Sequence, residues 1–470
     1  MLAEYPATKI LKELSINSLL PAILFRSSRR QCDIDVEKLA ETKGGRISEE
    51  DAAILKKEID SVIIKYAFQP EVIYEHAQYT TLVATAAGAH HAGQLLAWRL
   101  LLEELMTRGL LRLMIATGTV AAGVDFPART VVITSHSKRG SEGFGVLLSA
   151  ELQQMAGRAG RRGKDTVGIC LVAPSMFSDA RVIHEVSKRP PEALRSAYFA
   201  SPSTVLNLLK FRNVDDLRFT VSRSLAAFQD SKSAAKIRTQ AQEWQDEMPP
   251  EQKDKERDIK KQEKKIRRMF KEADLLEQKQ SMQLENTLER LRKLGFIEGS
   301  GLSEKGYWAA DLCTTLVLEL AEAINDEIFH DLQSAELAAL VGALAGDPHR
   351  SYFNLKANPL DKAYFQRLEL VIERINDAYQ GDTPYDVKVL PDAALTILLW
   401  IESNNWSEFN SMLKLAKVAA GDAARLVSQT ADHLNQIARL HKSHPQLAQI
   451  ALEARKRILK PPLGEALIID

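Results

Sequence analysis

Short apolar runs alternate with helical patterns over residues 19–173, and this alternation constrains the fold more than any other feature of the sequence. Strands that are apolar throughout and separated by helices indicate a parallel sheet covered by helices on both faces. In such sheets, binding and catalytic groups collect at the carboxyl ends of the strands. The predicted strands are 20–25, 111–117, 130–135 and 166–173, and 95–109 is a predicted amphipathic helix.

The rest of the chain is dominated by helical patterns. Residues 206–229 are typical of two packed helices, and residues 311–470 are predicted to be almost wholly helical, with breaks near 346–362 and 381–391. Residues 288–310 predict a helix, a glycine stop, two short strands and another helix, which is the order of a winged helix.

Residues 231–285 are dense in charge, as in the run EQKDKERDIKKQEKKIRRMFKEAD at 251–274. Acidic and basic residues alternate in this run, which favours a solvated helix or a short coiled coil over a nucleic-acid-binding tail. A sparse apolar stripe at Ile259, Ile266 and Phe270 marks the face that would pack.

Composition excludes several classes of protein. The 470 residues include 62 Lys and Arg and 62 Asp and Glu, so any nucleic-acid contact must come from local clusters rather than from net charge. Cys32, Cys170 and Cys313 are isolated, which excludes a disulfide framework and a CxxC zinc site. No apolar run reaches the roughly 20 residues of a membrane span, and the N-terminus does not have the pattern of a signal peptide. We therefore expect a reduced, cytoplasmic protein with no membrane contact.

The sharpest motif is QQMAGRAGRRG at 153–163. If this segment is helical, Gln154, Arg158 and Arg161 share one stripe, because they are four and three residues apart. Gly157 and the second glycine of the motif leave the adjoining face bare, so that a ligand or another backbone can approach. Forked guanidinium donors suit a chain of phosphates. We prefer this interpretation to a basic turn that caps a helix.

The segment ATGTVAAGVDFPA at 116–128 follows a predicted buried strand directly. Small and hydroxyl residues at the carboxyl end of a strand present hydroxyl and backbone N–H groups to phosphates. Taken alone, the segment is equally typical of a plain loop between a strand and a helix. Its position about 40 residues before the arginine motif favours the phosphate interpretation.

The adjacent His90 and His91 raise the question of a metal site. Neighbouring side chains on a strand or loop point apart, and no third ligand follows at a suitable spacing. A turn from a strand into a helix, with Gly93 near the cap, is the favoured interpretation.

Four segments resemble, in order and spacing, the later motifs of superfamily-two DExH-box helicases of the superkiller type, in the second of their two RecA-like motor domains. The likeness continues into segments that resemble the family's winged helix and its C-terminal helical ratchet. The motor segments are AILFRSSRRQCD (22–33), GAHHAGQLLAWR (88–99), IATGTVAAGVDFPARTVV (115–132) and QQMAGRAGRRGKDTVG (153–168). The later segments are SPSTVLNLLKF (201–211), LRKLGFIEGSGLSEKGYWAADL (291–312), WIESNNWSEFNSML (400–413) and AGDAARLVSQTADHLNQIARL (420–440).

The resemblance implies an α/β domain with a RecA-like parallel sheet, followed by a winged helix and an all-α helical bundle. Some relatives that work with the RNA exosome carry a large arch in the winged-helix region. Only the charged helical stretch occupies that place here, so we expect no arch-mediated exosome contact. The implied parts are a leader at 1–19, the RecA-like domain at 20–192, the winged-helix region at 193–310 with a charged insertion at 230–285, and the ratchet domain at 311–470.

The resemblance also implies roles for individual residues in ATP hydrolysis. ATP lies between two RecA-like domains in this family, and arginines of the second domain stabilise charge on the transferring phosphoryl group. Asp125 stands where relatives more often carry Asn. The implied catalytic residues are the arginine fingers Arg158 and Arg161, with Gln154 on the γ-phosphate side. Gly123, Asp125 and Gly157 are implied to lie at the ATP cleft.

A second set of residues is implied to contact nucleic acid. Residues 135–147 occupy the place of the family's strand-separating hairpin, although a plain surface hairpin is an equal alternative. On the ratchet, Arg425 and Gln429 are the implied pair, and a solvated helix face is the alternative for them. Ala420 stands where relatives often carry a glutamate. The implied contacts are Ser27, Arg29, Thr117 and Thr119 on the motor domain, Lys138 and Arg139 on the hairpin, and Arg425 and Gln429 on the ratchet.

Two motifs of a complete motor are absent from the 470 residues: GxxxxGK[ST] and DExH. Without them there is no phosphate-binding nest and no Mg²⁺ ligand. We therefore expect half of an ATP-dependent RNA helicase, inactive alone, whose first RecA-like domain is supplied by another chain or lost by truncation. ATP with Mg²⁺ and single-stranded or structured RNA are the implied ligands. RNA is favoured because DNA-directed cousins more often carry Pro at the position of Arg162. A non-catalytic nucleic-acid-binding protein and a DNA helicase of the same superfamily remain alternatives.

Overall fold

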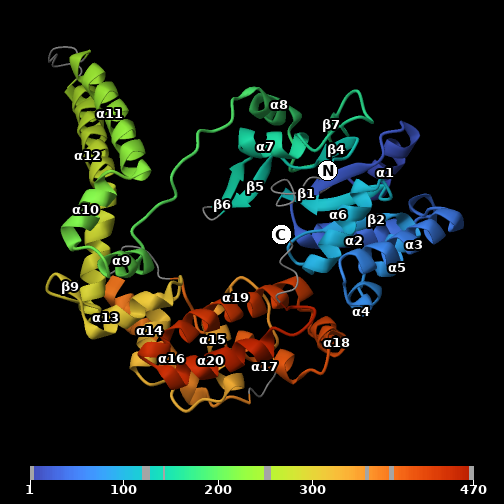
Figure 1. The fold of residues 1–470 in the computed structure, drawn as a ribbon. Coiled ribbons are helices and arrows are strands. Elements are labelled where there is room, and N and C mark those ends of the chain that lie inside the picture. Colours follow the sequence, from blue (N-terminus) through green and yellow to red (C-terminus); the bar gives the residue numbers. More distant parts are fainter. Residues whose placement is uncertain are drawn as a thin grey trace.

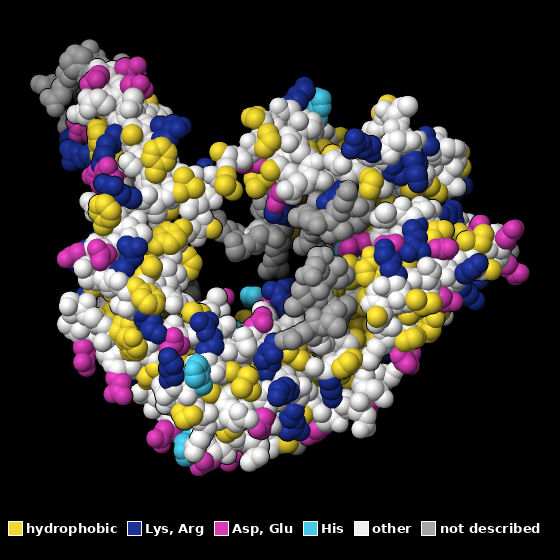
Figure 2. Space-filling model, in the orientation of Figure 1, with side chains coloured by type: hydrophobic (Ala, Val, Ile, Leu, Met, Phe, Trp, Pro, Cys, Tyr) yellow, Lys and Arg dark blue, Asp and Glu magenta, His cyan; other side chains and the backbone are white. Residues whose placement is uncertain are grey.

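The fold of the chain is given by a computed structural model, which describes residues 5–118, 127–140, 143–247, 256–354, 359–379 and 386–464. Figure 1 shows an α/β part, a helical bundle and a long helical hairpin that projects away from both. The visible face of the molecule is hollowed between these parts (Figure 2). Among the described residues, no helix combines the length and the apolar character needed to cross a membrane.

A five-stranded parallel sheet forms the centre of the α/β part, with strand order β2-β3-β1-β4-β7. This confirms the predicted parallel sheet, and each predicted run overlaps one strand. The additional strand, β2, comes from the segment that contains His90. The strands are β1 (Ala22–Arg26), β2 (Ala87–His90), β3 (Leu113–Thr117), β4 (Thr130–Ile133) and β7 (Ile169–Val172).

Successive residues of the central strand pack on opposite faces of the sheet. Ala22 and Leu24 belong to a core shared with α1 and α2, whereas Ile23 and Phe25 belong to a larger core that includes residues of α3, α5 and α6. Helices therefore cover both faces, as expected for an apolar parallel sheet. The helices of this part are α1 (Ala7–Ile16), α2 (Arg29–Glu41), α3 (Glu49–Lys65), α4 (Pro70–Tyr74), α5 (Tyr79–Thr85), α6 (Leu96–Thr107), α7 (Ser149–Ala156) and α8 (Ala180–Lys188).

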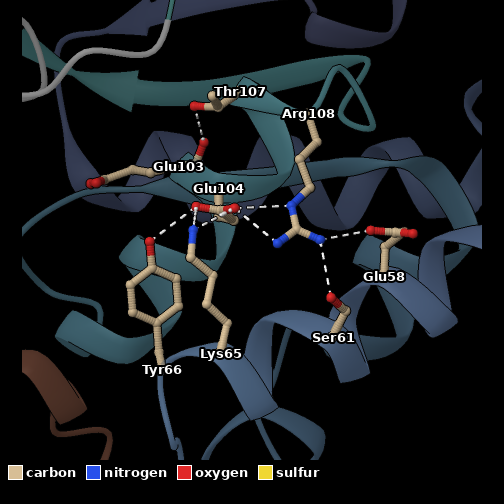
Figure 3. Close-up of polar contacts among 8 residues, drawn as sticks. All are labelled: Glu58, Ser61, Lys65, Tyr66, Glu103, Glu104, Thr107 and Arg108. Atoms are coloured by element: carbon tan, nitrogen blue, oxygen red, sulfur yellow. Dashed lines mark hydrogen bonds and ion pairs between the residues drawn. The ribbon is translucent and has the colours of Figure 1, made fainter.

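Polar contacts tie the outer side of α6 to α3 and the residue that follows it (Figure 3). Glu104 accepts hydrogen bonds from Lys65 at 2.9 Å and from the Tyr66 hydroxyl at 3.0 Å. Arg108 donates to Glu104 at 2.9 Å and to Glu58 at 2.7 Å. Helix α6 is thus fixed by its apolar inner face and by charged contacts on its outer side.

The strands β5 (Ser137–Gly140) and β6 (Gly143–Val146) form an antiparallel hairpin separate from the main sheet. The predicted hairpin at 135–147 is therefore confirmed as a structure. Its strand β6 is exposed, and Phe144 has 77% of its surface accessible.

The charged region forms two long helices that pack against each other, α11 (Leu225–Asp246) and α12 (Glu256–Lys293). Small buried residues of α11, such as Ala234, allow close approach to α12, where Ile266 is buried as predicted. Arg238 of α11 pairs with Asp274 at 2.7 Å and with Glu277 at 2.5 Å. The helical interpretation of this charged run is confirmed.

Two boundaries of this region differ from the prediction. The segment 206–229 contributes to three helices rather than two, because Asn213 and Ser224 cap new helices by accepting backbone N–H bonds. The helix predicted within 288–310 is the end of α12, because the sequence from 256 to 294 contains neither Gly nor Pro.

A small antiparallel pair follows α12, as the sequence predicted. Its strands are β8 (Ile297–Glu298) and β9 (Gly301–Leu302), and Gly295, with φ of +74°, turns the chain between α12 and β8. The neighbouring helices are α9 (Pro202–Leu209), α10 (Val214–Ser222) and α13 (Glu304–Ala309).

The last part of the described chain is a helical bundle with breaks after α15 and α16, where the sequence predicted them. Trp400 is fully buried and packs near Trp406 and Phe409, with ring centroids 5.9 and 5.1 Å away. The helices are α14 (Val317–Asn325), α15 (Ser334–Ala345), α16 (Lys362–Tyr379), α17 (Pro391–Glu402), α18 (Trp406–Ala416), α19 (Ala420–Ala438) and α20 (Pro445–Ile458).

Candidate nucleotide and nucleic-acid site

A cleft of about 480 Å³ opens at the carboxyl ends of β1, β3 and β4. Ser27 follows β1, Thr117 ends β3, Lys138 lies on β5 and Gln154 lies on α7, and all four line this cleft. The sequence predicted each of them as a site residue, and the fold brings them together from four separate segments. We call this the strand-end cleft.

The orientation of these residues follows from local hydrogen bonds. Ser28 caps α2 by accepting the backbone N–H of Gln31 at 3.2 Å, which leaves Ser27 exposed at the mouth of the cleft. Lys138 pairs with Glu151, which also accepts the backbone N–H of Leu148 at the start of α7. The lysine therefore connects the β5–β6 hairpin to the helix that carries Gln154.

The arginine motif departs from the expected helix. Helix α7 ends at Ala156, so Gln154 is helical, but Arg158 and Arg161 lie in the loop that follows. The prediction that these two arginines share one helical stripe with Gln154 is therefore wrong. Gly157 forms the helix cap and is exposed.

Backbone contacts fix the loop that carries these arginines. The Ala128 N–H donates to the Arg158 carbonyl at 2.9 Å, and the Gly160 N–H donates to the Ala128 carbonyl at 2.7 Å. Gly160 has φ of +95°, and a Cβ atom there would lie 3.1 Å from the Gly168 Cα. This conformation requires glycine and is not helical, so the helix cannot continue through residue 160.

Arg161 forms a two-point ion pair with Asp165. Its Nε and Nη2 atoms donate to the two carboxylate oxygens at 2.8 and 2.9 Å, and the Arg161 backbone N–H donates to Oδ2 at 3.0 Å. The hydrogen bonds from Arg161 lower the pKa of Asp165 to about 2. Among the described residues, Nη1 of Arg161 has no hydrogen-bond partner, so this nitrogen can still contact an anion.

Arg29 lies at the junction of the α/β part with the helical bundle. Its Nη1 atom pairs with Asp422 of α19 at 2.8 Å. A backbone hydrogen bond lies beside this ion pair: the Gly421 N–H donates to the Gly93 carbonyl at 3.0 Å. A Cβ atom on Gly421 would lie 2.6 Å from the Gly93 carbonyl carbon. The segment Ala420-Gly421-Asp422 therefore docks α19 onto the α/β part.

The paired histidines take part in hydrogen bonds within this junction. His91 Nδ1 accepts the Gly93 N–H at 3.1 Å, so the proton is on Nε2, which donates to Asp33 at 3.0 Å. His90 Nε2 pairs with Glu103 at 2.6 Å. Among the described residues there is no cluster of three His, Cys, Asp or Glu that could bind a metal ion.

The ratchet residues lie on α19, one turn apart as predicted. Arg425 is exposed and lines a cavity of about 350 Å³ between α6 and α19, whereas Gln429 is half-buried and does not line it. Arg99 of α6 lines the same cavity, and the sequence reasoning missed it. Its signal was present in GAHHAGQLLAWR, where an arginine closes an otherwise apolar helical turn.

Some predicted residues are not placed. Thr119, Gly123 and Asp125 lie outside the described residues, as does the side chain of Arg139. The strand-end cleft therefore contains only four of the predicted residues, and the other described ones, including Arg29 and Arg161, lie elsewhere.

Comparison with known proteins identifies relatives that match parts of the chain. Residues 299–466 match the family described as the DSHCT (NUC185) domain. The chain is 37% identical over 197 residues to the DExH-box ATP-dependent RNA helicase DExH15, chloroplastic, of Arabidopsis thaliana, a match that covers 41% of this chain and 16% of that protein.

Two further relatives match about half of the chain. The ATP-dependent RNA helicase mtr4 of Schizosaccharomyces pombe is 30% identical over 239 residues, which is 50% of this chain and 21% of that protein. Superkiller complex protein 2 of Homo sapiens is 31% identical over 228 residues, which is 48% of this chain and 18% of that protein. The matched region thus spans about a fifth of the length of these relatives.

Proposed function

Because the chain carries the C-terminal part of a Ski2-like DExH-box helicase, we propose that it is the RNA-binding and ATP-responsive half of an ATP-dependent RNA helicase. The other half is a first RecA-like domain with a P-loop and a DExH motif, in another chain or in a longer form of this one. The relatives named above as ATP-dependent RNA helicases support RNA and ATP as the ligands.

One observation carries the proposal: the strand-end cleft collects four predicted residues from four segments. Hydroxyl groups at the ends of neighbouring strands, beside a lysine and an amide, offer donors to the phosphates of a bound strand. Ser27 and Thr117 hold phosphates, and Lys138 presents the hairpin to the end of a duplex. Gln154 lines the same cleft, so we assign it to strand binding and not, as the resemblance implies, to the γ-phosphate side with Arg161.

ATP supplies the free energy that drives movement along the strand. The residues of this chain that fit it are those of the arginine loop, because Arg161 keeps Nη1 available while Asp165 fixes its other two nitrogens. A positioned guanidinium stabilises charge on a transferring phosphoryl group. The described residues do not fit Mg²⁺, since they hold no cluster of ligands, and the ion is assigned to the first RecA-like domain.

The test is ATP hydrolysis by the purified chain, with and without single-stranded RNA, repeated after addition of a first RecA-like domain from a relative. We expect no turnover by the chain alone and RNA-stimulated turnover by the mixture. Arg161→Ala should reduce that turnover by about 10³-fold. The control is Arg181→Ala, whose side chain is 95% exposed on α8.

Each other outcome contradicts a defined part of the proposal. Turnover by the chain alone would mean that it contains its own nucleotide site. RNA binding without turnover in the mixture would favour a non-catalytic nucleic-acid-binding protein. Equal stimulation by single-stranded DNA would favour a DNA helicase of the same superfamily.

A further inference from the structure

A cavity of about 650 Å³ lies between the linker at 193–199 and the hairpin of α11 and α12, and we call it the linker cavity. The linker belongs to no helix or strand and connects α8 with α9 (Figure 1). Residues of the linker and of both hairpin helices line the cavity, and the strand-end cleft shares none of them. Its volume is within the range of ligand sites. A molecule bound there would therefore contact the linker and the hairpin at once.

Large apolar side chains line the linker cavity without being buried. They come from the linker and from the first turns of α11, and each has more than half of its surface exposed. These side chains are Leu194, Phe199, Leu225 and Phe228. Single exposed apolar residues are ordinary on a protein surface, but a group of them at one cavity marks an interaction site.

Basic side chains share this cavity with the apolar ones. One lies on the linker, two lie on α11 and one lies on α12: Arg195, Lys232, Lys236 and Lys279. Within the described part of the chain, none of the four forms an ion pair. The acidic residue at the cavity, Asp230, already accepts a hydrogen bond from Gln280 at 2.9 Å. The molecule that complements this surface is therefore both acidic and apolar.

The backbone of the linker also offers hydrogen bonds. Gln229 of α11 holds one edge of it, because its Nε2 donates to the Leu194 carbonyl and its Oε1 accepts the Ser196 N–H, both at 2.8 Å. The N–H and carbonyl groups of neighbouring residues alternate in direction along an extended chain, so those of Arg195 point away from Gln229. Neither has a hydrogen-bond partner among the described residues. The linker thus presents an open edge that can pair with a second extended chain.

We propose that the linker cavity binds an extended peptide segment of a partner protein that carries acidic residues beside apolar ones. Its backbone pairs with the open edge at Arg195, its apolar side chains cover Phe199 and Phe228, and its carboxylates face the lysines of α11 and α12. The exposed leucines and the open backbone edge favour a peptide over an RNA strand, whose recognition uses stacking platforms. This inference goes beyond the proposed function and does not depend on it.

The probe is a library of short random peptides, displayed on phage and selected on the full chain. We expect the enriched sequences to combine Asp or Glu with Leu, Ile or Phe. A fluorescein-labelled copy of an enriched peptide is then titrated with the chain, and binding is followed by anisotropy. Hydrogen–deuterium exchange at 194–197 should slow in the complex, because the peptide closes the open edge of the linker.

Two substitutions, each with a matched control, locate the bound peptide. Lys279→Glu should weaken binding about fivefold at low salt, because an exposed attraction becomes a repulsion, and less as salt screens it. Lys271→Glu, on the same helix but outside the cavity, should change nothing. Phe228→Ala should weaken binding about tenfold through loss of apolar contact. Phe219→Ala, also more than half exposed but outside the cavity, should not.

The remaining outcomes would overturn the inference. Because all four substituted side chains are exposed, their urea-unfolding midpoints should equal that of the wild-type chain, and weaker binding confined to variants with a lowered midpoint would reflect misfolding. Enriched peptides that bind Lys279→Glu and Phe228→Ala as tightly as the wild-type chain would lie elsewhere.

Two other occupants of the cavity are distinguished by competition. If single-stranded RNA displaces the peptide and RNA binding itself is weakened by Lys279→Glu, the cavity is a nucleic-acid site. If an added first RecA-like domain displaces the peptide and its own association is weakened by Phe228→Ala, that domain covers the cavity. Either result would overturn the peptide site and leave the proposed function standing.

Discussion

Replacing Gly421 with alanine tests how the α/β part and the helical bundle are joined. The Gly421 N–H donates to the Gly93 carbonyl at 3.0 Å, and an added Cβ atom would lie 2.6 Å from both the Gly93 carbonyl carbon and the Gln94 carbonyl oxygen. Both neighbours are backbone atoms, so no side-chain rotation can relieve the contact. We expect the junction to open.

The magnitude follows from two contributions. Overpacking a close contact costs about 1–3 kcal/mol, and loss of the hydrogen bond costs about 1 kcal/mol. Together they shift the docking free energy by about 2–4 kcal/mol, which is about 30-fold to 700-fold in the docking equilibrium.

Hydrogen–deuterium exchange of peptides covering 91–95 and 419–423 measures this shift, because exchange there requires the junction to open. Gly44→Ala is the matched control, since its Cβ would meet no atom within 4 Å. Unchanged exchange in Gly421→Ala would refute the close contact. Acceleration shared by every peptide, including those of α12, would show global destabilisation and refute a local opening.

Three further predictions concern stability and pH. Trp400→Phe should lower the free energy of unfolding by about 1–3 kcal/mol in urea, because the Trp400 Nε1 bond to the Ile458 carbonyl, at 2.7 Å, is lost in a buried site; no change would contradict that bond. The pKa of Asp165 is about 2 in the folded chain, below the usual value of about 3.9, so its ion pair stabilises the fold above about pH 4 and is lost as the pH falls towards 2. An NMR titration of the Asp165 carboxyl checks this, and a midpoint near 4 would disprove it. Burial against Trp98 lowers the pKa of His76 from 6.5 to about 4, so the unfolded chain binds the proton more readily. Stability should therefore fall as the pH drops from 6.5 towards 4, by up to about 1.4 kcal/mol per pH unit, and the urea midpoint of His76→Phe should depend less on pH over that range.

The strand-end cleft was accessible to sequence reasoning because its residues are placed by local rules. Ser27 follows β1 and Thr117 is the last residue of β3, and parallel pairing brings the carboxyl ends of these strands to one edge of the sheet. The same periodicity identified the charged helices, although their true lengths depend on the absence of Gly and Pro from 256 to 294.

The arginine loop was harder to predict because its backbone is set by tertiary contacts. Helix periodicity over 153–163 is genuine up to Ala156, but the hydrogen bonds of Ala128 with Arg158 and Gly160 hold the following residues in a loop. A single sequence does not show which glycine adopts a positive φ.

The junction was not predictable for a different reason. Arg99 and Arg425 are more than 300 residues apart, and neither periodicity nor spacing relates positions over that distance. Only the folded chain shows that they line one cavity and that Gly421 closes the space beside it.

Helix α12 is continuous from Glu256 to Lys293, just before the strands β8 and β9, and this continuity makes it a lever. Its 38 residues span about 57 Å at 1.5 Å per residue. A tilt of about 10° at its base would therefore carry its far end through about 10 Å, with no hinge in the sequence to absorb the movement. The position of the first turn of α12 accordingly reports the orientation of the base of the helix, where Leu288 and Leu291 are fully buried.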